Sequence, residues 1–447
     1  MDARTLATYD RPVPRYTSYP TAAQFHGAVG PVEHRTWLQD LARTSATFYL
    51  HIPFCARLCW YCACHTSAVN RPDSLDAYAQ ALAKEIDLVA AVAPDLCIGS
   101  VQWGGGTPSQ LGADRLVSVA RQLASRFDRR SGEETSMEID PRFCDEALVG
   151  ALQAIGVNRV SLGVQDFDIG VQQAINRLQS VDDTAAAVGR LRGAGIQGIN
   201  IDLVYGLPRQ TPETLARTLD AALQLAPDRF AVFAYAHVPW MKARQKLIDA
   251  EALPGAAERS AMAALVSERL LAGGYVKVGL DHYALPHDAL AMAVQHGQLR
   301  RSFQGYVAEE RPWVVGLGAS AISSLPRGYT QNATDTARYR SLMDAATFAT
   351  ARGLEFCAAD RLRGEIIERL MCTFSVDLAE VCGRHHVSLP SFVAEIEALP
   401  ALVDDGLVER QGDRLNVTER GQPLVRFVCA AFDHHLHHAD GRHSRGI

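Results

Sequence analysis

From Thr47 to about Leu253 the sequence alternates short apolar runs with longer amphipathic ones. The short runs are TFYLHI, SVQW, SMEID, NRVSLG, INIDLVYG and RFAVFAY, and segments such as SLDAYAQALAKEIDLVAAVA and PETLARTLDAALQLA lie between them. Strands apolar enough to be buried on both faces are typical of a parallel sheet covered by helices. The six repeats therefore predict an α/β fold, with the chemistry in the loops at the carboxyl ends of the strands.

After Leu253 this alternation stops. A predicted helix, AERSAMAALVSERLLAGG, leads into a loop-rich region that contains SFQGY and GLGASAIS. From about Asp360 the pattern is mainly helical, and LVERQGDRLNVTERG then reads as two short strands around a Gly-Asp turn. We therefore predict an N-terminal extension (1–45), a βα domain with its own extension (46–353) and a helical, winged-helix-like C-terminal domain (354–447).

Composition narrows the function classes. With 447 residues the chain can bury a large core without metal staples, so a metal centre would be functional. A net charge of −6 argues against a nucleic-acid-binding protein of the basic-patch type. The first residues lack the apolar core of a signal peptide, and no stretch approaches the length of a membrane span. We expect a cytoplasmic protein whose clustered thiols hold metal or do redox chemistry.

Four of the ten cysteines lie in the run CARLCWYCAC, directly after the first predicted strand. Cys55, Cys59 and Cys62 have the spacing C-x3-C-x2-C, which is compact enough for one loop to surround a cluster. Three thiolates can hold three irons of a cubane cluster and leave the fourth iron without a protein ligand. That iron could chelate S-adenosylmethionine and pass an electron to its sulfonium, giving a 5′-deoxyadenosyl radical.

Two other interpretations of the run stay open. A structural zinc site usually has two Cys/His pairs separated by a longer stretch, and no second pair follows here, although His51 and His65 could complete an unusual site. The cysteines could also be ordinary buried thiols.

The cysteine spacing, preceded by YLHIPFC and containing Tyr61, resembles the radical S-adenosylmethionine superfamily. The wider pattern is similar to the oxygen-independent coproporphyrinogen III oxidase (dehydrogenase) family, through PRYTSYPTA, WGGGTP, EIDPR, SLGVQDF, NIDLVYGLP, YAHVP, FQGY and GASAIS. This resemblance implies an incomplete, three-quarter barrel of six βα units, with the N-terminal extension over the active site. It also implies oxidative decarboxylation of two propionates of coproporphyrinogen III to vinyl groups, giving protoporphyrinogen IX in haem biosynthesis.

The resemblance further implies one [4Fe–4S] cluster on Cys55, Cys59 and Cys62, with Cys64 off the cluster, and two molecules of S-adenosylmethionine. The contacts to S-adenosylmethionine that it implies are Tyr49, Tyr61, Gly105, Gly106, Thr107, Glu138, Gln165, Arg177, Asp202, Ala236 and Ile322. Independently, the WGGGTP glycines would let backbone approach a ligand, and Thr107-Pro108 could open a helix that attracts a carboxylate. Glu138 and Asp140 share one strand face, where they would serve a cofactor or form a structural ion pair.

A substrate with four propionates needs cations around it. The candidates are Arg15 in PRYTSYPTA and Arg300 and Arg301 before SFQGY, against the alternative that each is a solvated surface arginine. A low-potential donor such as flavodoxin or ferredoxin is expected, together with an electron acceptor that the sequence does not identify. We expect a monomer that binds neither nucleic acid nor membrane. The His-rich end, DHHLHHADGRHSR, reads as a metal site or a frayed tail.

Two other functions fit parts of this pattern. Haem chaperones and haem-utilisation relatives share HIPFC and the three cysteines, but lack PRYTSYPTA and the fourth cysteine. A haem-binding or electron-transfer protein without catalysis would not need the second set of S-adenosylmethionine positions.

Overall fold

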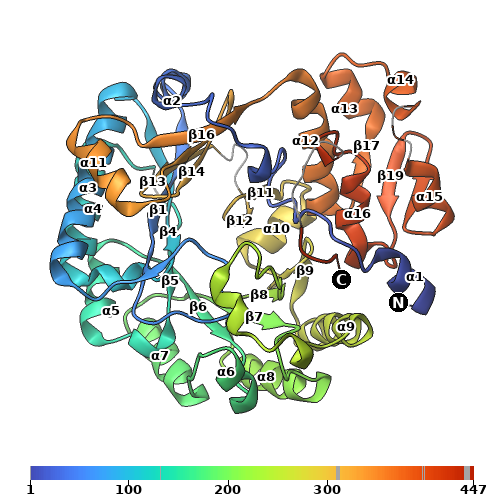
Figure 1. Cartoon of the computed structure of the whole chain (residues 1–447), viewed down its shortest axis with the longest axis horizontal. Coiled ribbons are helices and arrows are strands. Elements are labelled where there is room, and N and C mark those ends of the chain that lie inside the picture. The colour runs from blue at the N-terminus through green and yellow to red at the C-terminus, as the bar shows by residue number, and fades with distance from the viewer. Residues whose placement is uncertain are drawn as a thin grey trace.

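The computed structural model describes residues 2–130, 132–308, 313–394, 396, 398–436 and 443–446. A twelve-stranded sheet with helices along its outer side forms one part of the molecule, and a mainly helical region forms the other (Figure 1). Part of the His-rich end, 437–442, falls outside the described residues. Within the described residues, no helix is both long enough and apolar enough to cross a membrane.

The six predicted strands form the centre of the sheet, adjacent and parallel in chain order. They are β1 (Ser45–Ile52), β4 (Cys97–Gly105), β5 (Thr135–Ile139), β6 (Arg159–Gln165), β7 (Gly198–Tyr205) and β8 (Arg229–Ala234). The helices between them are α3 (Pro72–Val92), α4 (Ala113–Arg126), α5 (Glu146–Ala154), α6 (Ile169–Ala174), α7 (Val181–Gly193) and α8 (Pro212–Gln224). The sheet ends at β16 (Thr350–Glu355) and β9 (Val276–Val278) without closing, so the predicted α/β fold is confirmed as an open, incomplete barrel.

Local sequence explains these helices. Ser180 begins α7 in a capping box with Asp183, and Thr211 caps α8 ahead of Pro212. Leu82 of α3 is fully buried in the same core as Phe48 of β1. Burying side chains of this size contributes about 1.5–3 kcal/mol each. The apolar faces of the helices therefore pack against the sheet, and the loops lie at the ends of the strands.

The region after Leu253 contains more strands than predicted. The predicted helix is present as α9 (Ala256–Ala272), and SFQGY lies in a hairpin of β11 (Arg300–Ser302) and β12 (Gly305–Val307). The expectation of loops is wrong for the rest: the region also holds β9 (Val276–Val278), β10 (His282–Ala284), α10 (Ala289–Gln295), β13 (Val314–Leu317), β14 (Ile322–Leu325), β15 (Gly328–Asn332), α11 (Thr336–Asp344) and β16 (Thr350–Glu355). Strands of three to six residues are too short to show a period in the sequence.

Strand β13 extends the parallel part of the sheet on the other side of β1, and β14 to β16 follow it antiparallel. A Cβ at Gly316 in β13 would lie 2.5 Å from the carbonyl oxygen of Ile322. Only glycine permits that close approach between β13 and β14. The GASAIS segment is thereby brought beside the end of β1.

The C-terminal region is helical with a small sheet, as predicted. Its elements are α12 (Ala358–Thr373), β17 (Ser375–Asp377), α13 (Leu378–Arg384), α14 (Leu389–Ala394), α15 (Leu399–Asp404), β18 (Val408–Gln411), β19 (Arg414–Val417) and α16 (Val425–Ala430). The three strands pair in the order β17-β19-β18. The boundaries predicted at residues 45 and 353 stay predictions.

The N-terminal extension connects the two parts. Helix α1 (Ala3–Tyr9) lies beside the C-terminal region in Figure 1. Tyr9, Val13 and Tyr16 belong to the hydrophobic core of the C-terminal region. Helix α2 (Pro31–Gln39) lies at the other side, near β16. Residues between these helices therefore cross from one part of the molecule to the other.

Candidate cofactor and substrate site

The cysteine loop leaves the carboxyl end of β1. Its base is held by two short parallel strands, β2 (Phe54–Cys55) and β3 (Ser67–Ala68). The Sγ of Cys55 lies 3.1 Å from the hydroxyl of Thr66, and Cys59 is buried. The backbone N–H of Cys64 donates to the Sγ of Cys62 at 3.4 Å. Three thiols of one loop thus lie at the strand end where the sequence predicted a site.

Residues from distant elements brace this loop. Gln245 Nε2 donates to the carbonyls of Tyr61 at 2.7 Å and Ala236 at 3.1 Å. Arg244 Nη2 donates to the carbonyl of Thr66 at 2.7 Å. This joins the predicted residues Tyr61 and Ala236 through a side chain that sequence reasoning missed. No pattern in the sequence distinguishes Arg244 and Gln245 from ordinary polar residues.

The glycines of WGGGTP end β4 against the same loop. Gly105 has φ +110°, and a Cβ there would lie 2.6 Å from the His51 ring. At Gly106 a Cβ would lie 2.6 Å from the carbonyl oxygen of Phe54. Contacts within the protein therefore require these glycines, whatever ligand binds beside them. Thr107 places its hydroxyl 3.6 Å from the Sγ of Cys55, and the helix that follows is one 3₁₀ turn, η2 (Pro108–Leu111).

Tyr49, Glu138 and Asp202 come from alternate strands of the barrel, β1, β5 and β7. A Cβ on Gly104 would lie 2.8 Å from Glu138 Oε1 and 3.0 Å from a ring carbon of Tyr49, so these two predicted residues are close together. Glu138 is exposed on the inner side of the barrel. The protein around it nevertheless removes much of its hydration, and this desolvation raises its pKa to about 7, with a further contribution from the charge of Asp202. Asp202 lies inside β7 and accepts hydrogen bonds at 2.7 Å from Ser161 and from Asn200.

Arg177 links the cysteine loop to the ends of β5 and β6. Its Nη1 donates to the Sγ of Cys59 at 3.4 Å and pairs with Asp140 at 3.2 Å, and its Nη2 donates to the carbonyl of Gly163. Asp140 also pairs with Arg142 at 2.6 Å, so its role is an ion pair, unlike that of Glu138. Gln165 ends β6 with φ +72°, an unfavourable conformation for a residue with a Cβ. Such strain is concentrated at functional sites.

His51 and the GASAIS turn complete this edge. The Nδ1 of His51 lies 3.0 Å from the hydroxyl of Tyr49, and its Nε2 lies 3.2 Å from the Ser320 hydroxyl. Both ring nitrogens therefore have protein partners, which disfavours His51 as a zinc ligand. Ile322 starts β14 and packs against the aromatic cluster around Phe25.

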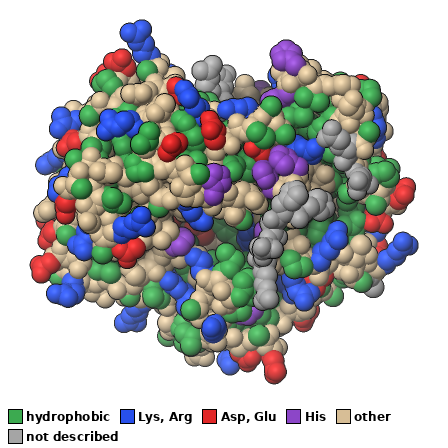
Figure 2. Space-filling model, turned by 45° about the horizontal axis from the view of Figure 1, so that its top comes forward, with side chains coloured by type: hydrophobic (Ala, Val, Ile, Leu, Met, Phe, Trp, Pro, Cys, Tyr) green, Lys and Arg blue, Asp and Glu red, His purple; other side chains and the backbone are tan. Residues whose placement is uncertain are grey.

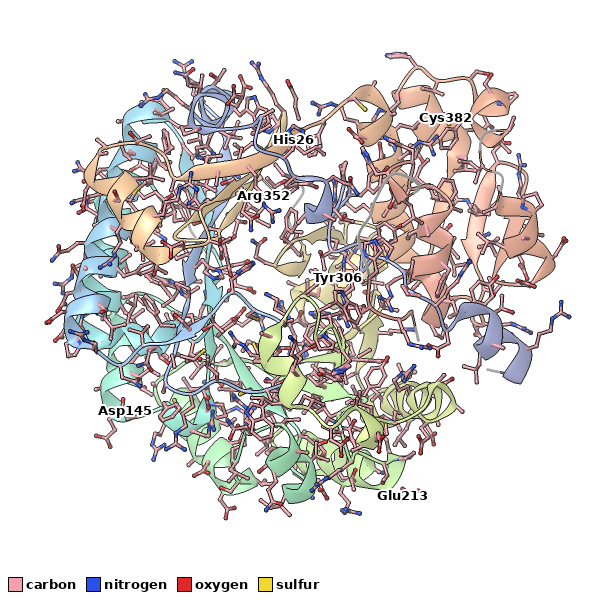
Figure 3. The ribbon with its side chains drawn as sticks, viewed as in Figure 1. His26, Asp145, Glu213, Tyr306, Arg352 and Cys382 are labelled. Atoms are coloured by element: carbon pink, nitrogen blue, oxygen red, sulfur yellow. The ribbon has the colours of Figure 1, made fainter. Side chains whose placement is uncertain are left out.

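The three predicted arginines separate into two groups. Arg300 points at α12, where both oxygens of Glu368 bind its guanidinium at 2.9 Å. Arg301 lies 4.3 Å over the ring of Tyr306, near the middle of the molecule (Figure 3). Its side chain is 7% exposed, and within the described residues its Nε and Nη1 have no hydrogen-bond partner. Its Nη2 lies 3.9 Å from a carboxylate oxygen of Asp281, so the ion pair covers only one side of the guanidinium. Buried donors without a hydrogen-bond partner are costly, which favours an anionic ligand at Nε and Nη1.

Arg15 belongs to the same interior group as Arg301. Its Nη2 donates to the carbonyl of Ala234 at the end of β8, at 2.7 Å. Burial would raise the pKa of Asp281, but Arg301, His282 and Arg15 lower it to about 2. The N-terminal extension thus contributes a cation over the barrel mouth. Figure 2 shows Lys or Arg side chains in the hollow near the middle of one face. A cavity of about 930 Å³ also lies between residues 16–19, the β11-β12 hairpin and α12.

The donor set fits the groups that the sequence predicted. All ten cysteines are free thiols, and the three predicted ligands lie on one loop with a buried Arg177 beside them. Thiolates are the protein ligands of iron–sulfur clusters. The carboxylates of Glu138 and Asp202 and the Nε of Arg177, which has no partner among the described residues, offer polar groups to a second ligand.

Comparison with known proteins identifies the class and then the family. Residues 49–222 match the family model described as the Radical SAM superfamily, and residues 358–424 match the HemN C-terminal domain. Oxygen-independent coproporphyrinogen III oxidase from Bradyrhizobium diazoefficiens is 44% identical, over 97% of each chain. The enzyme of that name from Pseudomonas aeruginosa is 39% identical over 97% of this chain and 96% of its own.

A solved structure agrees with these relatives. Coproporphyrinogen III oxidase (HemN) from Escherichia coli, a radical SAM enzyme, superposes with a TM-score of 0.90 at 35% identity, covering 94% of this chain and 98% of that one. The fold and cysteine loop therefore define a radical SAM protein. Within that superfamily, the chain belongs to the oxygen-independent coproporphyrinogen III oxidase family.

Proposed function

We propose that the protein converts two propionate side chains of coproporphyrinogen III to vinyl groups without oxygen, giving protoporphyrinogen IX for haem biosynthesis. The observation that carries this proposal is the three-thiol loop at the carboxyl end of β1 in a chain related over its full length to enzymes of this name. The full-length relationship, which includes the N-terminal extension, favours the oxidase over a haem chaperone.

The radical SAM family implies a [4Fe–4S] cluster and S-adenosylmethionine. Cys55, Cys59 and Cys62 would hold the cluster, and Cys64 would stay off it. When bound, these groups would supply a 5′-deoxyadenosyl radical that removes a hydrogen atom from the propionate β-carbon. The propionate radical would then release carbon dioxide and pass one electron to a separate electron acceptor, which balances the formation of the vinyl group.

The residues around the loop would orient this chemistry. Arg177 donates to Cys59 and so stabilises the charge of a ligating thiolate. Glu138 and Asp202 would accept hydrogen bonds from the ammonium or ribose of S-adenosylmethionine. The predicted contacts from Tyr49 and Gly105 around to Ile322 outnumber those that one molecule needs, which supports two molecules of S-adenosylmethionine.

Arg15 and Arg301 would bind substrate propionates. The support is their position at the barrel mouth, together with the Nε and Nη1 of Arg301, which have no hydrogen-bond partner among the described residues. Arg300 is a weaker candidate, because Glu368 already occupies its guanidinium. We further propose a cytoplasmic monomer that receives electrons from a flavodoxin or ferredoxin.

The test is anaerobic incubation of the reduced, cluster-reconstituted protein with coproporphyrinogen III and S-adenosylmethionine. Protoporphyrinogen IX and 5′-deoxyadenosine should both form. A haem chaperone or an electron-transfer protein would form no protoporphyrinogen. Absence of both products from protein with full iron content would refute the proposal.

A further inference from the structure

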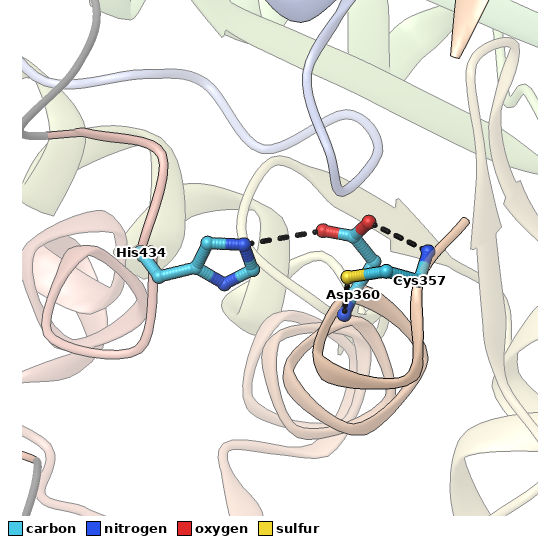
Figure 4. Close-up of side chains that lie close together, drawn as sticks. All are labelled: Cys357, Asp360 and His434. Carbon is cyan, nitrogen blue, oxygen red and sulfur yellow. Dashed lines mark hydrogen bonds and ion pairs between the residues drawn. The ribbon is translucent and has the colours of Figure 1, made fainter. Parts of the chain in front are cut away.

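A second group of metal-ligating side chains lies away from the cysteine loop, at the start of α12. It consists of Cys357, the N-cap residue of that helix, Asp360 in its first turn, and His434, which follows α16 (Figure 4). The Cys357 thiol, a carboxylate oxygen of Asp360 and a ring nitrogen of His434 all lie within 4.8 Å of one another. Ligand atoms around a tetrahedral zinc are about 3.5 Å apart, so small side-chain movements would suffice.

The two oxygens of Asp360 have separate partners. Its Oδ2 accepts the backbone N–H of Cys357 at 3.0 Å, as part of the capping box that starts α12. Its Oδ1 faces the Nε2 atoms of His434 at 3.5 Å and His435 at 2.7 Å. Asp360 is only 4% exposed, so the helix cap holds this carboxylate with Oδ1 directed at the imidazoles.

A helix cap alone does not explain this group. The cap needs an acceptor at position 357, where serine, threonine, asparagine or aspartate are preferred. It needs neither a thiol nor two histidines. The Sγ of Cys357 accepts the N–H of Asp360 at 3.4 Å, which leaves further sulfur lone pairs. A thiolate, an imidazole and a carboxylate oxygen are the ligands that zinc uses in proteins.

His434 is oriented as metal-binding histidines are. Its Nδ1 lies 3.2 Å from the hydroxyl of Tyr19, which fixes the ring and leaves Nε2 directed at Asp360. The imidazoles of His434 and His435 lie 4.1 Å apart, centroid to centroid.

We propose that Cys357, Asp360 and His434 bind one zinc ion, with His435 orienting Asp360. The Cys357 thiol would lose its proton on binding. The ion would tie the segment after α16 to the start of α12. Through Tyr19, it would also fix the N-terminal extension that carries Arg15 to the barrel mouth. With three protein ligands, the fourth position of the ion would be left to water, and the site is separate from the cysteine loop.

The first test uses the full-length, tag-free protein with its iron–sulfur cluster assembled. After incubation with zinc sulfate and gel filtration, elemental analysis should find one zinc per chain beside the cluster iron. Absorption fine structure at the zinc edge should show one sulfur at about 2.3 Å and nitrogen or oxygen at about 2.0–2.1 Å. No retained zinc, an all-sulfur shell or a shell without sulfur would each overturn the proposal.

The second test removes single ligands. Cys357→Ser keeps the helix cap, because serine is a good N-cap residue, and His434→Ala removes the imidazole. Zinc should fall from one per chain to a trace in both. The matched control is His385→Ala, since His385 also pairs with a carboxylate of α12, Glu365 at 2.9 Å, but is not one of the three proposed ligands. It should keep its zinc.

Iron content shows whether each variant has folded. If Cys357→Ser and His434→Ala keep iron and also keep zinc, the proposal is wrong. Zinc that is lost only on deletion of residues 437–447 would indicate adventitious binding by the histidines of the tail, and would also overturn it.

Discussion

The cysteine loop and the outer face of α12 both concentrate polar side chains, but they hold them differently. Around the loop the partners are buried: Arg177, which is 7% exposed, donates to Cys59 and pairs with Asp140. On α12 the ion pairs are partly open to water, and Glu365, with its side chain 25% exposed, meets Arg384 and His385.

This difference decides what each network can do. A charge pair at the surface contributes little to stability, because water and salt screen it. A buried and fully paired group fixes positions, because leaving its partner unpaired is costly. The loop network therefore fixes the positions of its side chains, whereas the pairs on α12 contribute little to stability.

The largest expected effect comes from the cysteines themselves. Serine at Cys55, Cys59 or Cys62 should prevent cluster assembly and abolish turnover, because each thiolate would hold one iron. Cys64→Ser should keep both the iron and the visible absorption of the cluster. Iron and sulfide content after anaerobic reconstitution measure this. Loss of iron in Cys64→Ser would contradict the prediction that three of the four cysteines hold the cluster and that Cys64 does not.

The buried side of the comparison also predicts a pH effect at Glu85 of α3. Its carboxylate accepts from the Gly318 N–H, the Tyr339 hydroxyl and the Asn332 amide at 2.6, 2.7 and 2.6 Å. Burial raises its pKa from 4.5 to about 7, against those three hydrogen bonds. The carboxyl group of Glu85 therefore stays protonated to a higher pH in the folded protein than in the unfolded chain.

Stability should therefore fall as the pH rises from 4.5 to about 7, and be level below that window. The reference is Glu85→Gln, whose side chain does not titrate. Relative to this variant, the free energy of unfolding of the wild type should fall by about 3 kcal/mol between pH 4.5 and about 7. Urea unfolding at several pH values measures the difference. A difference that does not change with pH would show that Glu85 stays ionised in the fold.

Arg300 and Arg301 are neighbours in β11, between the barrel and α12, and provide a matched pair of variants. Arg301→Ala should lower kcat/KM by about 10–100-fold, since it removes a charge-assisted hydrogen bond worth about 1.5–3 kcal/mol. Arg300→Ala should change it far less, because Arg300 is already bound to Glu368. Steady-state kinetics with varied coproporphyrinogen III measure both. Equal losses, with unchanged iron content, would remove Arg301 from the substrate site.

The smallest effect is expected on the exposed side. His385→Ala removes one member of the Glu365 network and should cost less than about 1 kcal/mol of stability. That cost should shrink further at high salt. Denaturant titrations at low and high ionic strength measure it. A cost of several kcal/mol would show that the α12 pairs are as important for the fold as the buried ones.

The sequence by itself determined the parallel sheet and the cysteine loop. Both features can be recognised from short stretches of sequence. The pattern of apolar residues that identifies a strand or a helix lies within that element, and Cys55, Cys59 and Cys62 lie in one run directly after β1. Chain order then fixed the neighbours, because each βα unit places its strand beside the one before it.

The tertiary structure decided what depends on distant pairing. It placed β13 beside β1, Arg244 and Gln245 against the loop, and Asp281 near Arg15 and Arg301. It also brought His434 to Cys357. None of these contacts has a local period or spacing, since each depends on how buried faces pack together after the chain has turned back many times. A sequence shows which residues could react, whereas packing decides which of them meet.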